Sequence, residues 1–361
     1  MKVLHLPYNV ASVASTSVRM LNKYGHEAQG VVIAANTITS TDDIISLKPY
    51  ILKKNASGIK QRLQYIQTLY KLIKWADILH WYWNESVLPL QLDFRFKKLF
   101  NKPGVVEWLG SDIRILEIEL QDNPYFKRAN DHYGQTFKVT HYNDSYKVQK
   151  EFLENGFEPV VTTGMTSYLI PELFPKYYSL RQRILSDNFI PKFPDANNKR
   201  PLIIHSPSSP EFKGTEFILQ AIDKLKPLYD FDFKLVIGMP HQQALELMQQ
   251  CDIYIDQLIL GCHGYAACEA MAFGKPVICF VKDSLLNEYP PSLPLVNANP
   301  DNIAHVLADL ISDSQLRHDL GIKGRAYIDA FHDEKKLTDE MVCIYEDVMR
   351  KHALKKINAP S

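Results

Sequence analysis

The sequence predicts an α/β protein made of two doubly wound domains. Short apolar strands alternate with helical patterns along the whole chain, which is typical of parallel sheets joined by crossover helices. The chain has 361 residues, and a single core stops growing at roughly 250–300 residues. We therefore expect two domains, each with its own parallel sheet.

The first half of the chain contains four predicted strands and one early helix. Residues Ser12–Lys23 are expected to form a helix that stops at Gly25. The prolines of Pro171–Arg200, followed by a polar run, indicate the connection between the domains. The four strands are VLHL, QGVVIA, DILHWYW and GVVEWL.

The second half contains the strands LIIHS, FKLVIG, DIYIDQL and PVICFV. Only one helix, about His241–Gln250, fits between the second and third of these strands. A last helix from Glu334 to about Lys355 carries apolar residues at helical spacing. These residues are Leu337, Met341, Ile344, Tyr345 and Val348.

Composition and charge exclude several classes of protein. Basic and acidic residues number 41 each, so no overall field favours nucleic acid as a partner. No apolar run reaches the roughly 18 residues that span a bilayer, and the N-terminus does not resemble a signal peptide. The five cysteines are an odd number without a CxxC pair, which predicts free thiols in a reducing cytoplasm.

The most informative stretch is GYAACEAMAFGKPVICFV, Gly264–Val281. A glycine turn precedes a short helix, a Gly-Lys-Pro step ends it, and an apolar strand follows. The N-terminus of a helix offers unpaired N–H groups and partial positive charge, which suit a phosphate. Glu269, about a turn further in, could accept hydrogen bonds from two ribose hydroxyls. The pattern predicts a site for a nucleoside diphosphate.

This stretch resembles the donor-site helix of glycosyltransferase family 4, which reads roughly E-x7-E-A-M-A-x-G-x-P-V. The second glutamate is Glu269, whereas Gly261 stands in the place of the first. Other segments resemble the family in the expected order. They are Val139–Met165 at the end of the first domain, Pro201–Leu225 at the start of the second, and the closing helices of Pro300–Phe331.

The resemblance implies the GT-B fold, with two Rossmann-like domains that face each other across a cleft. Residues 1–175 would form the acceptor-side domain, and residues 176–335 would bind the nucleotide sugar. A C-terminal helix, about 336–361, would cross back to the first domain. The implied activity is retaining transfer of a sugar to a glycan, lipid-linked or other hydroxyl acceptor, in polysaccharide or glycoconjugate biosynthesis. Transfer would use no metal and no cofactor besides the donor.

Two charged residues are the leading donor-binding candidates. By resemblance, Lys213 touches the diphosphate, although it could also be a solvated lysine of a first helical turn. The family arginine about six residues earlier is replaced by Pro207. Hydroxyls of Ser206, Ser208 and Ser209 could partly compensate by hydrogen bonding. Glu269 is the candidate ribose ligand, with a structural ion pair as the alternative.

The backbone of His263 to Ala266 is the expected phosphate nest, with Gly264, Tyr265 and Ala266 as donor-binding candidates. His263 is a candidate for contact with the donor sugar, or else a structural histidine. In the first domain, Asp112 follows a predicted strand, and Arg114 could orient it. We treat Asp112 as a sugar-binding or catalytic candidate, with capping of the next helix as the alternative.

No DxD-type pair is placed to hold a metal, so Lys213 and the helix N-terminus would stabilise the diphosphate.

Two other functions stay open. A catalytically silent GT-B protein that binds a nucleotide or glycan is the main alternative. Gly261 and Pro207 favour it, whereas Glu269 and Lys213 argue against it. A sugar-nucleotide epimerase lacks an evident cluster of acids in the first domain.

Residues 44–76 contain no acidic residue and seven basic ones. Ile59, Leu63, Ile66, Tyr70 and Ile73 fall at helical spacing within this stretch. It is either a solvated helix packed on the first sheet or a surface for an anionic partner. Such a partner would be an acidic glycan or the inner face of a membrane that carries the acceptor. The basic residues are Lys48, Lys53, Lys54, Lys60, Arg62, Lys71 and Lys74.

Overall fold

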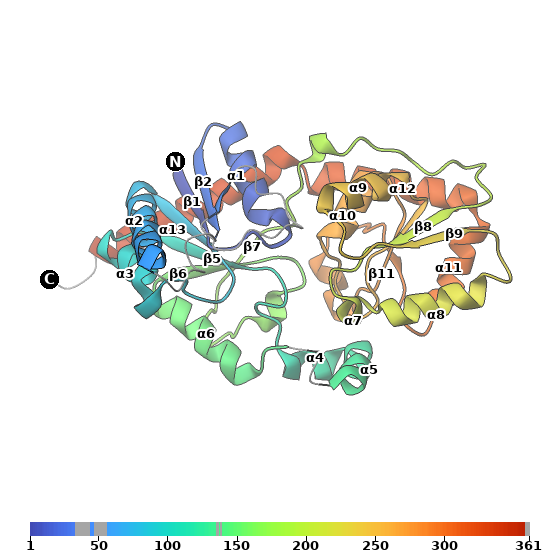
Figure 1. Ribbon diagram of the computed structural model, residues 1–361, viewed down its shortest axis with the longest axis horizontal. Coiled ribbons are helices and arrows are strands. Elements are labelled where there is room, and N and C mark those ends of the chain that lie inside the picture. The colour runs from blue at the N-terminus through green and yellow to red at the C-terminus, as the bar shows by residue number, and fades with distance from the viewer. Residues whose placement is uncertain (33–43, 47–55, 135–136, 138, 358–361) are drawn as a thin grey trace. The chain divides into compact units, whose positions relative to one another are not determined.

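The computed structural model describes residues 1–32, 44–46, 56–134, 137 and 139–357. The chain divides into two compact units (Figure 1). Unit 1 comprises Met1–Ile115, Thr140–Arg183 and Glu334–Ser361, and unit 2 comprises Leu116–Val139 and Ile184–Asp333.

Unit 1 is built on a seven-stranded sheet with the order β3-β2-β1-β4-β5-β6-β7. Every neighbouring pair in it is parallel. The four strands predicted in the first half are β1, β2, β4 and β5. In β4 and β5 every residue is buried, because helices cover both faces of a parallel sheet. The bounds are β1 Lys2–Leu6, β2 Glu27–Val32, β3 Ile44–Ser46, β4 Ile78–Tyr82, β5 Gly104–Trp108, β6 Phe157–Val161 and β7 Tyr178–Ser179.

The helices of unit 1 include the predicted N-terminal helix, which is α1, and the predicted C-terminal helix, which is α13. The predicted apolar face of α13 is buried, and Met341 and Tyr345 pack with Val3 of β1 and Val105 of β5. The C-terminal helix therefore returns to the sheet that the N-terminus begins. The bounds are α1 Val13–Lys23, α2 Ala56–Trp75, α3 Leu92–Leu99, α6 Tyr142–Glu154 and α13 Glu334–Ile357.

Unit 1 also contains a buried polar network that joins its sheet to Arg183 and to α13. Glu107 of β5 accepts a hydrogen bond at 2.6 Å from Arg183, the last residue before the chain enters unit 2. The same carboxylate oxygen lies 2.9 Å from His80 Nε2, and His80 Nδ1 lies 2.6 Å from the Tyr345 hydroxyl on α13. Since all four side chains are buried, the network attaches residue 183 and α13 to the centre of the sheet.

Unit 2 is built on a five-stranded parallel sheet with the order β12-β11-β10-β8-β9. It contains all four strands predicted in the second half of the chain. As predicted, one helix, α9 His241–Gln250, lies between β9 and β10. The strand bounds are β8 Leu202–His205, β9 Asp232–Leu235, β10 Ile253–Ile255, β11 Val277–Cys279 and β12 Val296–Asn297.

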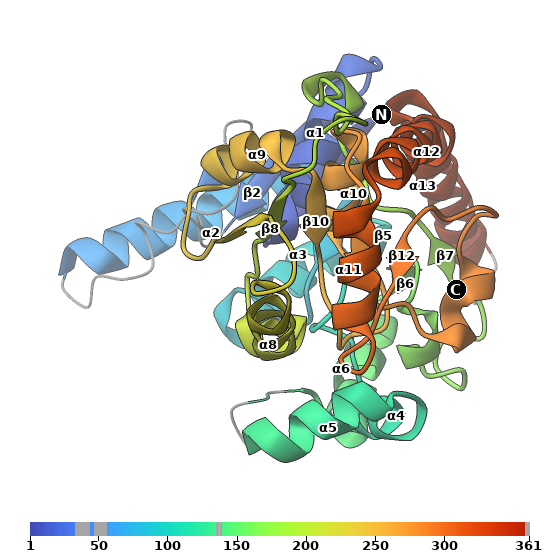
Figure 2. The same cartoon turned by 90° about the vertical axis from the view of Figure 1, so that its right-hand side faces the viewer.

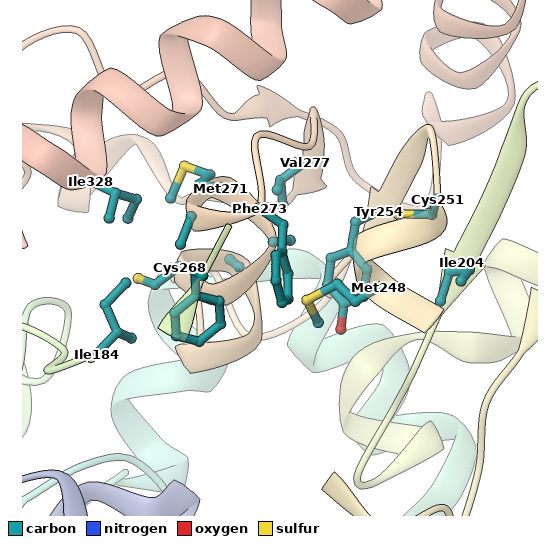
Figure 3. Close-up of a cluster of buried hydrophobic side chains, with 14 of the residues drawn as sticks. Ile184, Ile204, Met248, Cys251, Tyr254, Cys268, Met271, Phe273, Val277 and Ile328 are labelled. Carbon is teal, nitrogen blue, oxygen red and sulfur yellow. The ribbon is translucent and has the colours of Figure 1, made fainter. Parts of the chain in front are cut away.

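The core of unit 2 lies on both faces of this sheet. One cluster packs Tyr254 and Met248 with Cys268 and Met271 of α10 (Figure 3). The other packs α8 and α11 against Ile203, Ile253 and Ile278. The remaining bounds are α4 Leu116–Asp122, α5 Pro124–Tyr133, α7 Pro210–Lys213, α8 Thr215–Leu225, α10 Tyr265–Ala272, α11 Ile303–Ser312 and α12 Ser314–Phe331.

The segment 116–139 belongs to unit 2, although the predicted boundaries place it within residues 1–175. It contains the neighbouring helices α4 and α5 (Figure 2). Asn123 donates a hydrogen bond at 2.7 Å to the carbonyl of Ile259. The rings of Phe137 and Phe212 stack with their centroids 4.0 Å apart. The segment thus packs against α7 and the loop after β10, which carry the candidate site.

Candidate functional site

The candidate site lies in unit 2 at the carboxyl ends of the neighbouring strands β8 and β10. In parallel α/β sheets this is the edge where ligands bind. The chain after β8 leads to α7, which ends at Lys213, and the chain after β10 leads to Gly264 at the start of α10. A Cβ on Gly264 would lie 3.4 Å from Lys213 Nζ. The lysine and the predicted phosphate nest are therefore neighbours in space.

Lys213 forms an ion pair that the sequence did not reveal. Its Nζ lies 2.6 Å from Oδ1 of Asp256, the residue that follows β10. The other oxygen, Oδ2, accepts a hydrogen bond at 2.9 Å from the N–H of Gly264. The Lys213 side chain is 16% exposed and the Asp256 side chain 1% exposed. Asp256 thus contacts both the lysine and the backbone at the N-terminus of α10.

The surroundings of the pair shift the pKa of each group toward its charged form. Burial acts to lower the pKa of Lys213, but attraction to Asp256 and the hydrogen bond between them raise it above its ordinary value. Burial likewise acts to raise the pKa of Asp256, but Lys213 and the Gly264 N–H lower it. An ammonium and a carboxylate therefore stand side by side at the carboxyl end of the sheet.

His205 positions the loop that carries Lys213. Its Nδ1 lies 2.8 Å from the carbonyl of Ile255 in β10, and its Nε2 lies 2.9 Å from the hydroxyl of Thr215. Burial lowers the pKa of His205 to about 4, so the ring is neutral near pH 7. A neutral ring donates from Nδ1 to the carbonyl and accepts from Thr215, which fixes the start of α8 one residue beyond Gly214.

Glu269 lies on the side of α10 opposite its buried residues, with its side chain 13% exposed. Its carboxylate lies 2.9 Å from Nε2 of His241, the first residue of α9. The hydrogen bond to Glu269 raises the pKa of His241, and burial opposes this. Glu269 is thus mostly buried and is bound by the first side chain of α9.

The other donor-binding candidates lie around this pair. The hydroxyls of Ser206 and Tyr254 lie 2.7 Å apart, which orients Ser206 at the end of β8. Ser208 is exposed on the same loop, whereas Pro207 is buried. Tyr265 and Ala266 form the first turn of α10. The N-cap residue Gly264 has no side chain to cap this helix, and its N–H is bound by Asp256.

His263 is buried among protein groups. Its ring centroid lies 4.8 Å from that of Tyr289, and its Nδ1 lies 3.7 Å from Sγ of Cys268. The residue is 3% exposed, and burial lowers its pKa. His263 therefore packs inside the loop before α10, and its contact with the donor sugar stays a prediction.

Gly261 stands where the pattern of glycosyltransferase family 4 has its first glutamate, and the structure leaves no room for a side chain there. It has φ +73, which favours glycine, and a Cβ there would lie 2.2 Å from Cγ of Lys282. Lys282 is buried and its Nζ lies 2.9 Å from Asp122 and 3.9 Å from Glu119, both on α4. The stem of Lys282 therefore fills the space that a side chain at residue 261 would need.

Asp112 lies in unit 1, in the turn after β5. Its carboxylate accepts hydrogen bonds from the N–H groups of Leu109, at 3.1 Å, and Gly110, at 2.7 Å. It holds its own turn in this way, and the next helix begins only at Leu116. Burial raises the pKa of Asp112 to about 6. A carboxyl group with a raised pKa is typical of residues that take part in proton transfer, and the role of Asp112 stays a prediction.

The basic stretch 44–76 is only partly within the described residues. Lys48, Lys53 and Lys54 lie outside them, and so do the side chains of Lys60 and Arg62. Lys71 and Lys74 are exposed on α2. Ile73 is buried, but Leu63 is 54% exposed. Along the described part of α2, the predicted apolar face is therefore buried at Ile73 but exposed at Leu63 and Tyr70.

Two findings on the described residues concern clustered metal ligands and helices that could span a membrane. The described residues contain no group of three or more His, Cys, Asp or Glu side chains that could hold a metal ion. Among the helices within the described ranges, none has the length and apolar character to cross a membrane.

No protein-family model matches the chain, and no curated protein does. Solved structures match it over almost its whole length. Sucrose-phosphate synthase from Thermosynechococcus elongatus is 14% identical, with a TM-score of 0.66, and the match covers 97% of this chain and 100% of that one.

Two further matches are structures that were solved with UDP bound. An alpha-glucosyltransferase in complex with UDP and DNA is 11% identical, with a TM-score of 0.63 over 97% of this chain and 99% of that one. HepE from Anabaena, in complex with UDP and glucose, is 11% identical, with a TM-score of 0.61 over 96% of this chain and 100% of that one. At these identities the likeness shows the fold. The predicted fold class is confirmed: the chain has the GT-B fold of two Rossmann-like domains.

Proposed function

We propose that this protein is a retaining glycosyltransferase that moves a sugar from a nucleoside diphosphate to a hydroxyl acceptor. One observation carries the proposal. Lys213 at the end of α7 lies beside the N-terminus of α10, the helix that also carries Glu269, at the carboxyl edge of one parallel sheet. A lysine and a helix N-terminus suit a diphosphate, and a carboxylate suits the ribose hydroxyls.

The proposed chemistry assigns a role to each group. The bond between the anomeric carbon and the diphosphate oxygen breaks, and the acceptor oxygen bonds to the same face of that carbon. The acceptor proton passes to the departing phosphate oxygen. Lys213 and the N–H groups of α10 stabilise the charge that develops on the diphosphate, which needs no metal ion. Glu269 holds the nucleoside in place for this step.

We propose UDP as the nucleotide and a glycan or lipid-linked hydroxyl as the acceptor. UDP is bound in the similar alpha-glucosyltransferase and HepE structures, and the acceptor class rests on the family resemblance. Asp112 is the proposed sugar-binding or acid–base group of unit 1. The burial that raises its pKa to about 6 supports this role.

Binding is the first test. Calorimetry of UDP against wild type, Lys213→Met and Glu269→Gln should show weaker binding in both variants. Loss of a hydrogen bond to a charged group costs about 1.5–3 kcal/mol. Lys226→Met and Glu246→Gln are matched controls, because these exposed side chains lie elsewhere in unit 2. Equal UDP affinity in all five proteins would refute the assigned site.

Features of the donor site also favour a second function, that of a catalytically silent protein. A silent GT-B protein would bind a nucleotide without transferring sugar. Pro207 brings no charge, the place of the first glutamate is filled by the Lys282 stem, and Asp256 already neutralises Lys213. A thermal-shift screen across UDP-, GDP-, CDP- and ADP-sugars identifies the donor, since a ligand at 100 times its Kd adds about 2.7 kcal/mol. Release of UDP from the bound sugar nucleotide then separates the enzyme from the silent protein.

A further inference from the structure

A carboxylate already occupies both groups that are proposed to bind phosphate. Asp256 accepts hydrogen bonds from Lys213 Nζ at 2.6 Å and from the Gly264 N–H at 2.9 Å. A phosphate oxygen at this sheet edge would use the same two donors. Asp256 also belongs to none of the family segments that predicted the site, and its negative charge opposes the charge of a diphosphate.

We propose that Asp256 is an internal counter-anion that competes with the diphosphate for Lys213 and the α10 N-terminus, and so sets the affinity of the site. The inference rests on the proposed function and names a further residue that determines donor binding. Three features of the site support it: the fixed backbone of Asp256, the balance of charges around it, and the flexible side chain of Lys213.

The backbone holds Asp256 in place. Its N–H donates to the carbonyl of Ile278 at 2.9 Å, and the preceding residue Ile255 pairs with His205 in the sheet. The side chain is short and 1% exposed, and Sγ of Cys279 lies 3.7 Å from Oδ2. The carboxylate therefore cannot move far from the α10 N-terminus when an anion arrives.

The charges of the Lys213–Asp256 pair cancel in this arrangement. Lys213 contributes one positive charge and Asp256 one negative charge, and the nearby His205 and His263 are neutral at pH 7 because burial lowers the pKa of each. The partial charge of the helix N-terminus is what is left to attract a diphosphate. At the place of the family arginine, Pro207 supplies no second cation.

Lys213 is the group that can change partners. It has a long flexible stem and is 16% exposed, so its ammonium can turn from Asp256 to an incoming phosphate. Binding then leaves the Asp256 carboxylate without its lysine and next to the new anion. The unpaired carboxylate weakens the binding of every ligand that uses Lys213. Replacing the Asp256 carboxylate by an amide removes this repulsion.

The test measures UDP and inorganic pyrophosphate binding by calorimetry in wild type, Asp256→Asn and Asp252→Asn. The amide introduced by Asp256→Asn keeps an acceptor for the Gly264 N–H but loses the charge, so both ligands should bind about ten-fold tighter or more, which is about 1.4 kcal/mol. Asp252 precedes the same strand at its opposite end and binds Leu202 and Asn198. Its variant removes an equal charge and should leave both affinities unchanged.

Two results would overturn the inference and have different meanings. If wild type binds UDP through Lys213 but Asp256→Asn binds it no tighter, Asp256 does not compete and the proposed function stands. If neither wild type nor Asp256→Asn binds UDP or any other nucleoside diphosphate, the proposed function fails together with the inference.

A second pair of variants guards against misfolding, since Asp256→Asn leaves a partly buried lysine unpaired. Lys213→Met alone is compared with Lys213→Met combined with Asp256→Asn, in which no charge of the pair is left. The double variant should bind pyrophosphate more tightly than the single one, because the repelling carboxylate is gone. Equal or weaker binding in the double variant would contradict the competition.

Discussion

Introducing a glutamate at residue 261, where the pattern of glycosyltransferase family 4 has one, should destabilise the protein and should not improve donor binding. A residue with a side chain at φ +73 costs roughly 1–2 kcal/mol. The new Cβ would lie 2.2 Å from Cγ of Lys282, and overpacking costs typically about 1–3 kcal/mol. We therefore expect Gly261→Ala to lower the free energy of unfolding by about 2–5 kcal/mol. Gly261→Glu should lower it at least as much.

Urea denaturation of Gly261→Ala, Lys282→Ala and the double variant separates the two costs. Lys282→Ala removes the stem, so the clash disappears in the double variant while the backbone strain persists. The double variant should therefore lose less stability than the two single variants lose in sum, and the difference should be about 1–3 kcal/mol. Additive effects, or a Gly261→Ala variant as stable as wild type, would show that Lys282 does not exclude a side chain at 261.

The remaining predictions concern pH, a buried ion pair and metal ions. The Glu269 hydrogen bond raises the pKa of His241, so this pair contributes stability below about pH 6.5 and loses it as pH rises through the raised pKa. If UDP displaces His241 from Glu269, the UDP affinity of wild type should rise between about pH 6 and 8, and it should rise more than that of His241→Gln. Calorimetry at several pH values measures both affinities, and parallel pH profiles would contradict the prediction. Arg183→Met should cost about 3–5 kcal/mol in urea denaturation, since it leaves Glu107 buried without its arginine. Arg128→Met breaks an exposed ion pair with Asp301 and should lower the free energy of unfolding by at most about 1 kcal/mol. Equal losses of stability in the two variants would refute the predicted difference between the buried and the exposed pair. Transfer from the donor should persist in EDTA, whereas loss of activity that manganese restores would mean that a metal holds the diphosphate.

Local patterns were sufficient for most of the fold. The alternation of apolar strands and helical segments predicted both parallel sheets, and the spacing of Leu337, Met341 and Tyr345 predicted the buried face of α13. These features depend on burial periodicity within a few residues, which the order of amino acids expresses directly. The segment 116–139 was assigned by its position in the chain, but its membership of unit 2 depends on contacts such as that between Asn123 and Ile259.

The sequence by itself determined which groups stand at the ends of the strands: Lys213, Gly264 and Glu269 each follow a recognisable local pattern. Only the tertiary structure decided what those groups contact. Asp256 lies 43 residues from Lys213 along the chain, and His241 lies 28 residues from Glu269. The Lys282 stem that excludes a side chain at Gly261 comes from beyond β11. Such partners are brought together by the packing of separate strands and loops, and no short-range pattern encodes that packing.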